Sequence, residues 1–314
     1  MVNMDEKAAR IALLTRAAWD EGLPPPLTRR MYSRLCASGA LSTLVLRSAA
    51  WDDPALSDRA RLLMSRVGAA GRYLCQLEEQ GYDMLLPGDV NWPVRLRSLG
   101  EGMPQFLCLK GNRALLGQRA ISVAGSRDIS AVTARLAAEI GEKIAEEGFV
   151  MVCGGARGTD DAAQRALLEA GGSLILVPAL PVRELLHGYA YLRAALDEGR
   201  LLMLCDTLPE EPFSPAKALE RNHTIYALGE AAVVVASRKG TGGSWRGAAD
   251  CLRLGYTPVY VPDGAAADME GNRALMEIGA GTLDITRKIG EQLHARRTMQ
   301  LDMFALAQTG GVRC

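Results

Sequence analysis

The stretch of this sequence best suited to binding an anion is a glycine-rich segment with one arginine. It consists of Gly154, Gly155, Ala156, Arg157, Gly158, Thr159 and Asp160. The segment joins an apolar run over 149–153 to a helical pattern over 161–170. A turn between a strand and a helix directs unpaired backbone N–H groups and the positive end of the helix dipole at one point. Arg157 adds a cation whose forked donors match phosphate oxygens. The segment therefore predicts a phosphate site; the alternative is a tight turn that needs glycine only for close packing.

Two further segments combine a short apolar strand with small residues and a cation. One covers 121–127 and ends in Gly125, Ser126 and Arg127. The other covers 233–237 and continues into Arg238, Lys239, Gly240, Thr241, Gly242, Gly243 and Ser244. In a doubly wound sheet the carboxyl ends of the parallel strands lie along one edge, so all three turns are expected to line one crevice. Arg127, Arg157 and Lys239 would then face the same polyanion.

These turns require a sheet that places them side by side. From about residue 81 short apolar runs alternate with amphipathic helices, which is typical of an extended Rossmann-like α/β fold with a doubly wound, mostly parallel sheet. Strands are predicted near 120–125, 149–153, 173–177, 201–205, 232–236 and 258–261, with two more near 83–86 and 105–110. We expect a small N-terminal helical domain over 1–80, the Rossmann-like domain over 81–290 and a tail over 291–314.

Composition limits the classes of protein that fit. The chain has 36 basic and 36 acidic residues, so a nucleic-acid site would have to be a local cluster of cations. Its 7 cysteines and 3 histidines lack metal-site or disulfide-framework spacing, and no metal or cofactor is expected. The apolar runs are far shorter than the roughly 20 residues of a membrane span and no signal peptide is evident, so we expect a cytoplasmic protein without a membrane partner.

The loops and several further motifs together resemble the DNA-processing protein A family (DprA, also called Smf) over about residues 80–282. The motifs are Gly125-Ser126-Arg127, the loop 154–160, Arg221-Asn222 and the loop 240–244. The resemblance implies a domain that binds single-stranded DNA without cleaving it, usually as a homodimer, and that helps to load the RecA recombinase during DNA uptake or recombination. It is not expected to be an enzyme.

Carried over by position, four cations would contact DNA phosphates: Arg127, Arg157, Arg221 and Lys239. The complete predicted site is Gly125, Ser126, Arg127, Gly154, Gly155, Arg157, Gly158, Arg221, Asn222, Lys239, Thr241, Gly242, Gly243 and Ser244. Among the departures from the family is one motif where the chain has Arg221-Asn222-His223 in place of Arg-Asn-Arg. One lost cation predicts weaker binding, because each phosphate contact contributes about 0.7 to the salt dependence on single strands. The alternative for Arg221 is a salt-bridged surface residue.

The C-terminal segment Gln300-Leu301-Asp302-Met303-Phe304 resembles the short peptide with which bacterial replication proteins dock on the DNA polymerase sliding clamp. The glutamine would hold the backbone while the apolar side chains fill a groove. The alternative is an amphipathic end that packs on its own domain.

Two other functions fit the same sequence. A nucleotide-binding protein or a phosphoribohydrolase also holds phosphate at Rossmann loops, and hydrolysis would need a positioned carboxylate such as Asp160, Asp161 or Glu169. Asp160 lies in the first helical turn, where a carboxylate also complements the helix dipole. The third hypothesis is an adaptor that the tail carries to the replisome.

Overall fold

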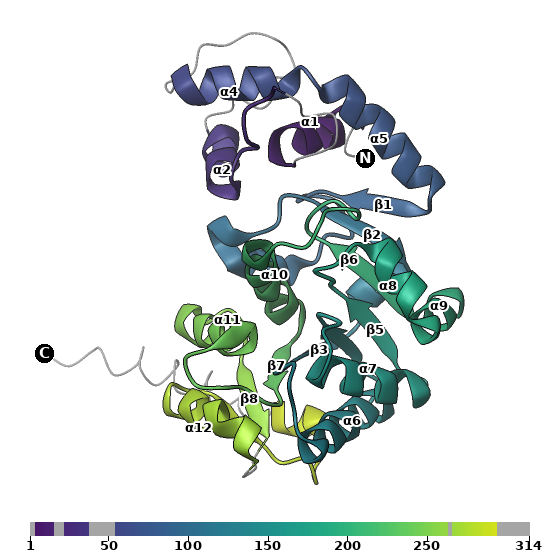
Figure 1. Cartoon of the computed structure of the whole chain (residues 1–314), viewed down its shortest axis with the longest axis vertical. Helices are drawn as coiled ribbons and strands as arrows, with labels where there is room; N and C mark the ends of the chain where they lie inside the picture. The colour runs from purple at the N-terminus through teal and green to yellow at the C-terminus, as the bar shows by residue number, and fades with distance from the viewer. Residues whose placement is uncertain (1–3, 16–21, 38–53, 263–265, 294–314) are drawn as a thin grey trace, which may run out of the picture. The chain divides into compact units, whose positions relative to one another are not determined.

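The computed structural model describes residues 4–15, 22–37, 54–262 and 266–293 (Figure 1). The chain divides into two compact units, each made of two segments. Unit 1 comprises Met1–Gly117 and Ile175–Ala227, and unit 2 comprises Gln118–Leu174 and Leu228–Cys314. The predicted domain boundaries near residues 80 and 290 follow a different division and remain predictions.

The described strands form a mixed, mostly parallel sheet in the order β1-β2-β6-β5-β4-β3-β7-β8-β9. Pairing is antiparallel between β1 and β2 and between β2 and β6, whereas β3 runs parallel to β4 and to β7. The strands are β1 (Tyr82–Leu85), β2 (Leu107–Gly111), β3 (Ala120–Ala124), β4 (Val150–Cys153), β5 (Ser173–Leu176), β6 (Leu201–Cys205), β7 (Ala231–Val234), β8 (Val259–Pro262) and β9 (Gly281–Leu283). The predicted fold class and all eight predicted strands are confirmed; β9 was not predicted.

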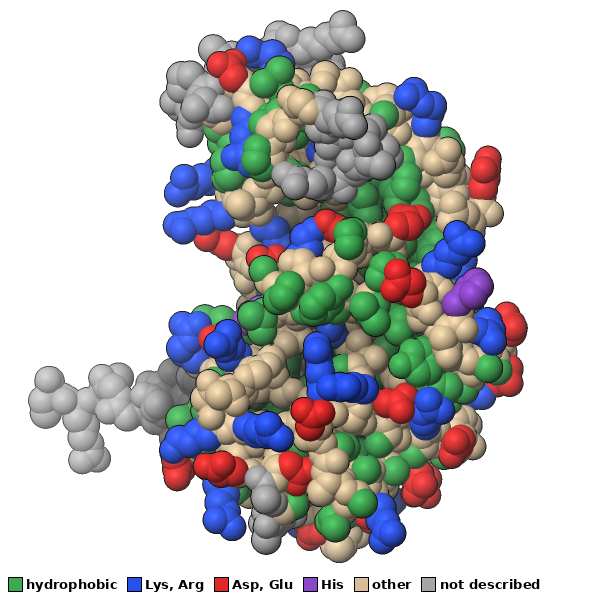
Figure 2. Space-filling view, in the orientation of Figure 1, with side chains coloured by type: hydrophobic (Ala, Val, Ile, Leu, Met, Phe, Trp, Pro, Cys, Tyr) green, Lys and Arg blue, Asp and Glu red, His purple; other side chains and the backbone are tan. Residues whose placement is uncertain are grey.

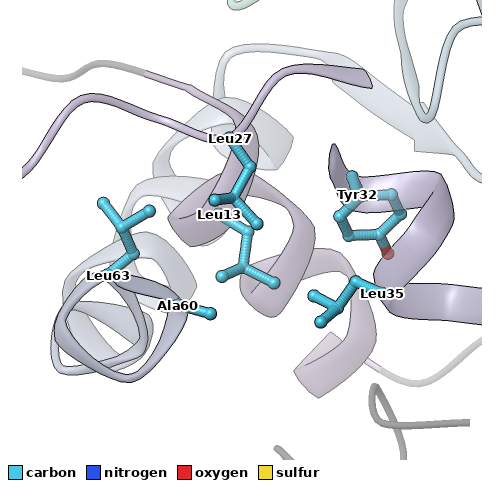
Figure 3. Packing of buried hydrophobic residues seen from close by; sticks show 6 residues of the cluster. All are labelled: Leu13, Leu27, Tyr32, Leu35, Ala60 and Leu63. Carbon is cyan, nitrogen blue, oxygen red and sulfur yellow. The ribbon is translucent and has the colours of Figure 1, made fainter. Parts of the chain in front are cut away.

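Unit 1 contains a group of N-terminal helices with a core of their own (Figure 1). The helices are α1 (Met4–Leu14), α2 (Arg29–Ala37), α4 (Pro54–Met64) and α5 (Val67–Glu79). Figure 3 shows how the buried side chains of this core point toward one another: Leu13, Leu27, Tyr32, Leu35, Ala60 and Leu63. These side chains come from α1, α2 and α4 and from the segment before α2, and they form a buried cluster.

Among its described residues, unit 1 also contains the strands β1, β2 and β6 and five further helices. They are η1 (Val94–Gly102), η2 (Arg113–Gly117), α8 (Val182–Gly188), α9 (Ala190–Asp197) and α10 (Pro215–Leu228). Arg29 of α2 joins the N-terminal helices to β6, because its guanidinium donates to a carboxylate oxygen of Asp206 at 3.0 Å. Asp206 directly follows β6 and is buried.

Unit 2 carries β3, β4, β7, β8 and β9 together with the helices that follow them. These are α6 (Ala131–Glu146), α7 (Thr159–Glu169), α11 (Gly242–Leu254), η3 (Ala267–Met269) and α12 (Glu270–Glu277). Helices α6 and α7 lie side by side (Figure 1), and a Cβ at Gly141 would collide with the carbonyl oxygen of Ala163. Glycine at position 141 therefore permits the close approach of these two helices. No helix among the described residues is long and apolar enough to cross a membrane.

Candidate functional site

The three predicted loops follow the neighbouring strands β4, β3 and β7 of unit 2. The loop after β3 is in the middle, and backbone hydrogen bonds continue the β3–β7 pairing beyond both strands. The Val235 N–H donates to the carbonyl oxygen of Ala124 at 2.9 Å, and the Ser126 N–H donates to that of Ala236 at 2.9 Å. The loops thus leave the same edge of the sheet.

Side chains and backbone groups of the outer two loops contact the middle loop. The N–H and Oγ1 of Thr159 donate to the carbonyl oxygen of Ser126 at 3.2 and 3.1 Å. On the other side, the Oγ of Ser244 donates to the carbonyl oxygen of Gly125 at 2.6 Å. The structure therefore brings together the loop residues that the sequence assigned to one crevice.

Two of the predicted glycines are required by packing between these loops. A Cβ at Gly125 would collide with the side chain of Thr159, and a Cβ at Gly158 would collide with the carbonyl oxygen of Arg127. Gly158 also has a φ of +84°, which disfavours any other residue. The close-packing alternative thus accounts for Gly158, and the same physical reason applies to Gly125.

Two glycines of the loop after β7 border open space. Gly240 and Gly242 have φ values of +72° and +78°, and a Cβ at either would meet no atom within 4 Å. An external backbone can therefore approach the chain closely at these two glycines.

Backbone donors of the glycine-rich segment are partly used by the chain itself. Asp160 is buried, with only 6% of its surface exposed. Its Oδ2 accepts hydrogen bonds from the N–H groups of Gly154 at 3.1 Å and Ala156 at 3.2 Å. Within the described part of the chain, the N–H groups of Gly155, Arg157 and Gly158 have no hydrogen-bond acceptor. Only this second set of donors is available to an anion.

The carboxylates considered for hydrolysis have other roles or lie far from the loops. Asp160 holds the turn through two backbone groups, and Asp161 pairs with Arg165 at 2.9 Å. Glu169 is the last residue of α7. At 1.5 Å per residue, it lies about 15 Å along the helix from the glycine-rich segment. The arrangement assigns Asp160 to stabilising the turn.

Exposed cations cluster on the loops. Arg127 has no hydrogen-bond or ion-pair partner among the described residues, and Arg157 makes one long contact, 3.5 Å, with Asp128. Both side chains of that pair are exposed, by 77% and 72%, so the pair is weak and Arg157 can exchange its partner for a phosphate.

The loop after β7 carries more charge than predicted. Lys239 and Thr241 are exposed, as are Arg238 and Arg246, which were not among the predicted site residues. Arg238, Lys239 and Arg246 have no ion-pair partner in the described part of the chain. Lys and Arg side chains (blue) gather near α11 in Figure 2. The adjacency of Arg238 to Lys239 in the sequence was the available signal for Arg238.

A carboxylate from η3 holds the start of α6, just beyond Arg127. Asp268 accepts from the N–H of Ser130 at 2.7 Å and from the Oγ1 of Thr133 at 2.9 Å. Burial alone would raise the pKa of Asp268, but these hydrogen bonds outweigh it and lower the pKa below the ordinary 3.8. The charged form of Asp268 is thus favoured in the folded protein.

Replacing Asp268 by Asn is expected to reduce the free energy of unfolding at pH 7 by about 1 kcal/mol. Because the folded-state pKa is lower than the unfolded one, the wild-type advantage is complete above about pH 4 and is lost as the pH falls through the folded-state value. Urea denaturation at pH 7 and pH 3 measures this difference. Asp250→Asn, which removes a partly exposed carboxylate paired with Arg253, is the control. An equal deficit at both pH values would contradict the assignment.

Arg221 and Asn222 lie on α10 in unit 1. Arg221 is 7% exposed, so its interpretation as a surface residue is wrong. Together with Cys205, Asp206 and Lys217 it lines a hollow whose walls also include several prolines. A phosphate contact at Arg221 remains a prediction, as does the tail site, because residues 300–304 lie outside the described residues.

The comparisons with known proteins agree with this architecture. A family model described as DNA recombination-mediator protein A matches residues 83–294. The DNA processing protein DprA of Bacillus subtilis is 26% identical over 235 residues, which cover 74% of this chain and 78% of that protein. A Mycobacterium tuberculosis protein named for DprA is 29% identical over 201 residues, and the match spans 59% of this chain but only about half, 51%, of that relative's length.

Two solved structures have the same fold. DNA processing protein A from Streptococcus pneumoniae superposes with a TM-score of 0.69 at 23% identity, covering 94% of this chain and 98% of that one. DNA processing protein A from Helicobacter pylori, a structure described for its single-stranded DNA binding mode, gives a TM-score of 0.56 at 20% identity. That match covers 68% of this chain and 96% of the Helicobacter chain.

Proposed function

This chain belongs to the DNA recombination-mediator protein A family, and we propose that it binds single-stranded DNA through the three loops of unit 2. The observation that carries the proposal is the set of exposed cations, Arg127, Arg157 and Lys239, on loops that contact one another. The single-stranded DNA binding mode described for the Helicobacter protein, which has the same fold, supports it. The proposed setting is DNA processing during uptake or recombination.

The overall charge of the chain makes this local cluster decisive. With a net charge of zero the protein has no general attraction for a polyanion, so affinity must come from cations placed at the contact. Arginine suits this role because its donors form bidentate hydrogen bonds to phosphate oxygens. The N–H groups of Gly155 and Gly158 provide further donors beside Arg157.

A salt titration tests the proposal directly. Fluorescence anisotropy of labelled oligo-dT should show binding at micromolar or lower concentration. Three phosphate contacts at about 0.7 each predict a slope of log K against log salt of about −2, or roughly a 20-fold weaker Kd between 50 and 200 mM salt. Unlabelled duplex of the same length serves as a competitor. Absence of binding, or binding insensitive to salt, would overturn the proposal.

We also infer that the protein is non-enzymatic and cytoplasmic and that it acts with other proteins. The proposed partners are a second copy of the chain, a RecA-type recombinase and, through Gln300, Leu301, Asp302, Met303 and Phe304, the polymerase sliding clamp. Family membership supports the first two, and the resemblance of the tail sequence supports the third.

A further inference from the structure

Trp245 lies in the first turn of α11, beside the proposed DNA site. It directly follows Ser244, whose Oγ is anchored to the middle loop through the carbonyl oxygen of Gly125. It also precedes the exposed Arg246. The backbone of Trp245 is therefore fixed at the edge of the sheet from which the cationic loops emerge.

The indole ring is only partly covered by the protein. The buried stripe of α11 contains Gly247, Ala248 and Cys251, and Trp245 lies on the flank of this stripe with part of its surface in solvent. Among the described residues it has no aromatic partner, no cation over its ring and no hydrogen bond to Nε1. By contrast, Trp92 in unit 1 is buried. A large apolar ring left partly in water gains free energy when a flat partner covers it.

Helix geometry directs the indole ring of Trp245 toward the loop after β7, which is part of the proposed DNA site. Side chains on an α-helix lean toward its N-terminus, so a residue in the first turn covers surface on the side of the preceding loop. Here that loop contains Arg238 and Lys239, which are exposed and without ion-pair partners in the described chain. The space around Gly240 and Gly242 is open. An aromatic face, cations and free volume thus occur together.

We propose that Trp245 stacks on a base of the DNA strand whose phosphates the loop cations hold. The inference rests on the proposed function and specifies the part of the strand that this site recognises. Sites for single strands combine cations that follow the backbone with aromatic rings on which bases stack, and they tolerate any base because each has a flat π-face. If the site contacted only the phosphates of the strand, the exposed part of Trp245 would have no binding role.

The test separates base contacts from phosphate contacts. Two labelled oligonucleotides of equal length are compared: oligo-dT, and one in which abasic deoxyribose units replace the nucleotides while every phosphate is kept. Wild-type protein should bind oligo-dT roughly tenfold more tightly than the abasic strand. Trp245→Leu should lose most of this preference but bind the abasic strand as wild type does, and Trp245→Phe should retain most of it.

The outcomes distinguish the two proposals. If wild-type protein binds neither strand, the proposed function fails. If it binds oligo-dT and Trp245→Leu keeps the full preference over the abasic strand, the stacking role of Trp245 is wrong. If Trp245→Leu no longer binds either oligonucleotide, tryptophan fluorescence decides between the possibilities. Stacking is supported if oligo-dT quenches the fluorescence of the wild-type protein but not that of Trp245→Phe. Equal quenching in the two proteins refutes it.

Discussion

Replacing both Arg127 and Arg157 by alanine is expected to weaken oligo-dT binding about 100-fold at 0.1 M salt. In the proposed site each guanidinium donates charge-assisted hydrogen bonds to a DNA phosphate, and such bonds contribute about 1.5 to 3 kcal/mol apiece without being fully additive. Loss of two phosphate contacts should also reduce the salt slope by about 1.4. Both side chains are exposed, so the fold should tolerate the change.

The matched control for this double variant removes two other cations of unit 2. Both lie at helix ends that are distant from the three loops. Lys143 lies in the last turn of α6 and Arg253 in the last turn of α11, each more than about 15 Å along its helix from the loops. Lys143→Ala combined with Arg253→Ala changes the net charge equally but should alter the Kd by less than about twofold. A similar loss of affinity in both double variants would indicate general charge attraction and contradict the loop site.

Gly158→Ala is expected to lower both stability and DNA affinity, because the loops after β3 and β4 contact each other at this glycine. Its backbone, with a φ of +84° and a ψ of −120°, costs an alanine about 1 to 3 kcal/mol, and the new Cβ would also collide with the carbonyl oxygen of Arg127. We expect the free energy of unfolding to fall by about 3 kcal/mol and oligo-dT affinity by at least about tenfold, since relief of the collision displaces both Arg127 and Arg157. Urea denaturation and anisotropy measure the two effects.

Gly171→Ala is the control for a positive φ without a collision. Gly171 follows α7 with a φ of +81°, close to that of Gly158, but a Cβ there meets no atom within 4 Å. It should therefore cost only the roughly 1 to 2 kcal/mol of conformational strain and leave affinity unchanged. If the two variants behave alike, contact between the loops has no part in forming the site.

The fold was predictable because its signals are local. Each predicted parallel strand of unit 2 is a run of apolar residues bounded by glycine or polar residues, as in 149–153, and its predicted limits agree with the structure within one or two residues. Strand β9, Gly281–Leu283, is too short to show any periodicity. Parallel topology then places successive loops at one edge, so the adjacency of the site loops followed without coordinates.

Details of the site depended on contacts between residues distant in the sequence. No pattern in the chain indicates that Gly125 packs against Thr159 or that Gly158 faces the Arg127 carbonyl group. The same applies to Arg221, whose burial reflects packing of α10 rather than any property of the Arg-Asn motif.

The amino-acid sequence by itself determined the alternation of strands and helices in the α/β fold, the resemblance to the family and the choice of Arg127, Arg157 and Lys239, because periodicity, glycine-rich turns and short motifs are encoded within single segments. Only the tertiary structure decided which donors remain available. It showed that Asp160 occupies the N–H groups of Gly154 and Ala156, and that Trp245 stays partly uncovered beside the cationic loop. Hydrogen bonding and burial depend on residues that the fold brings together from distant parts of the chain. The amino-acid sequence does not give the distances between such residues.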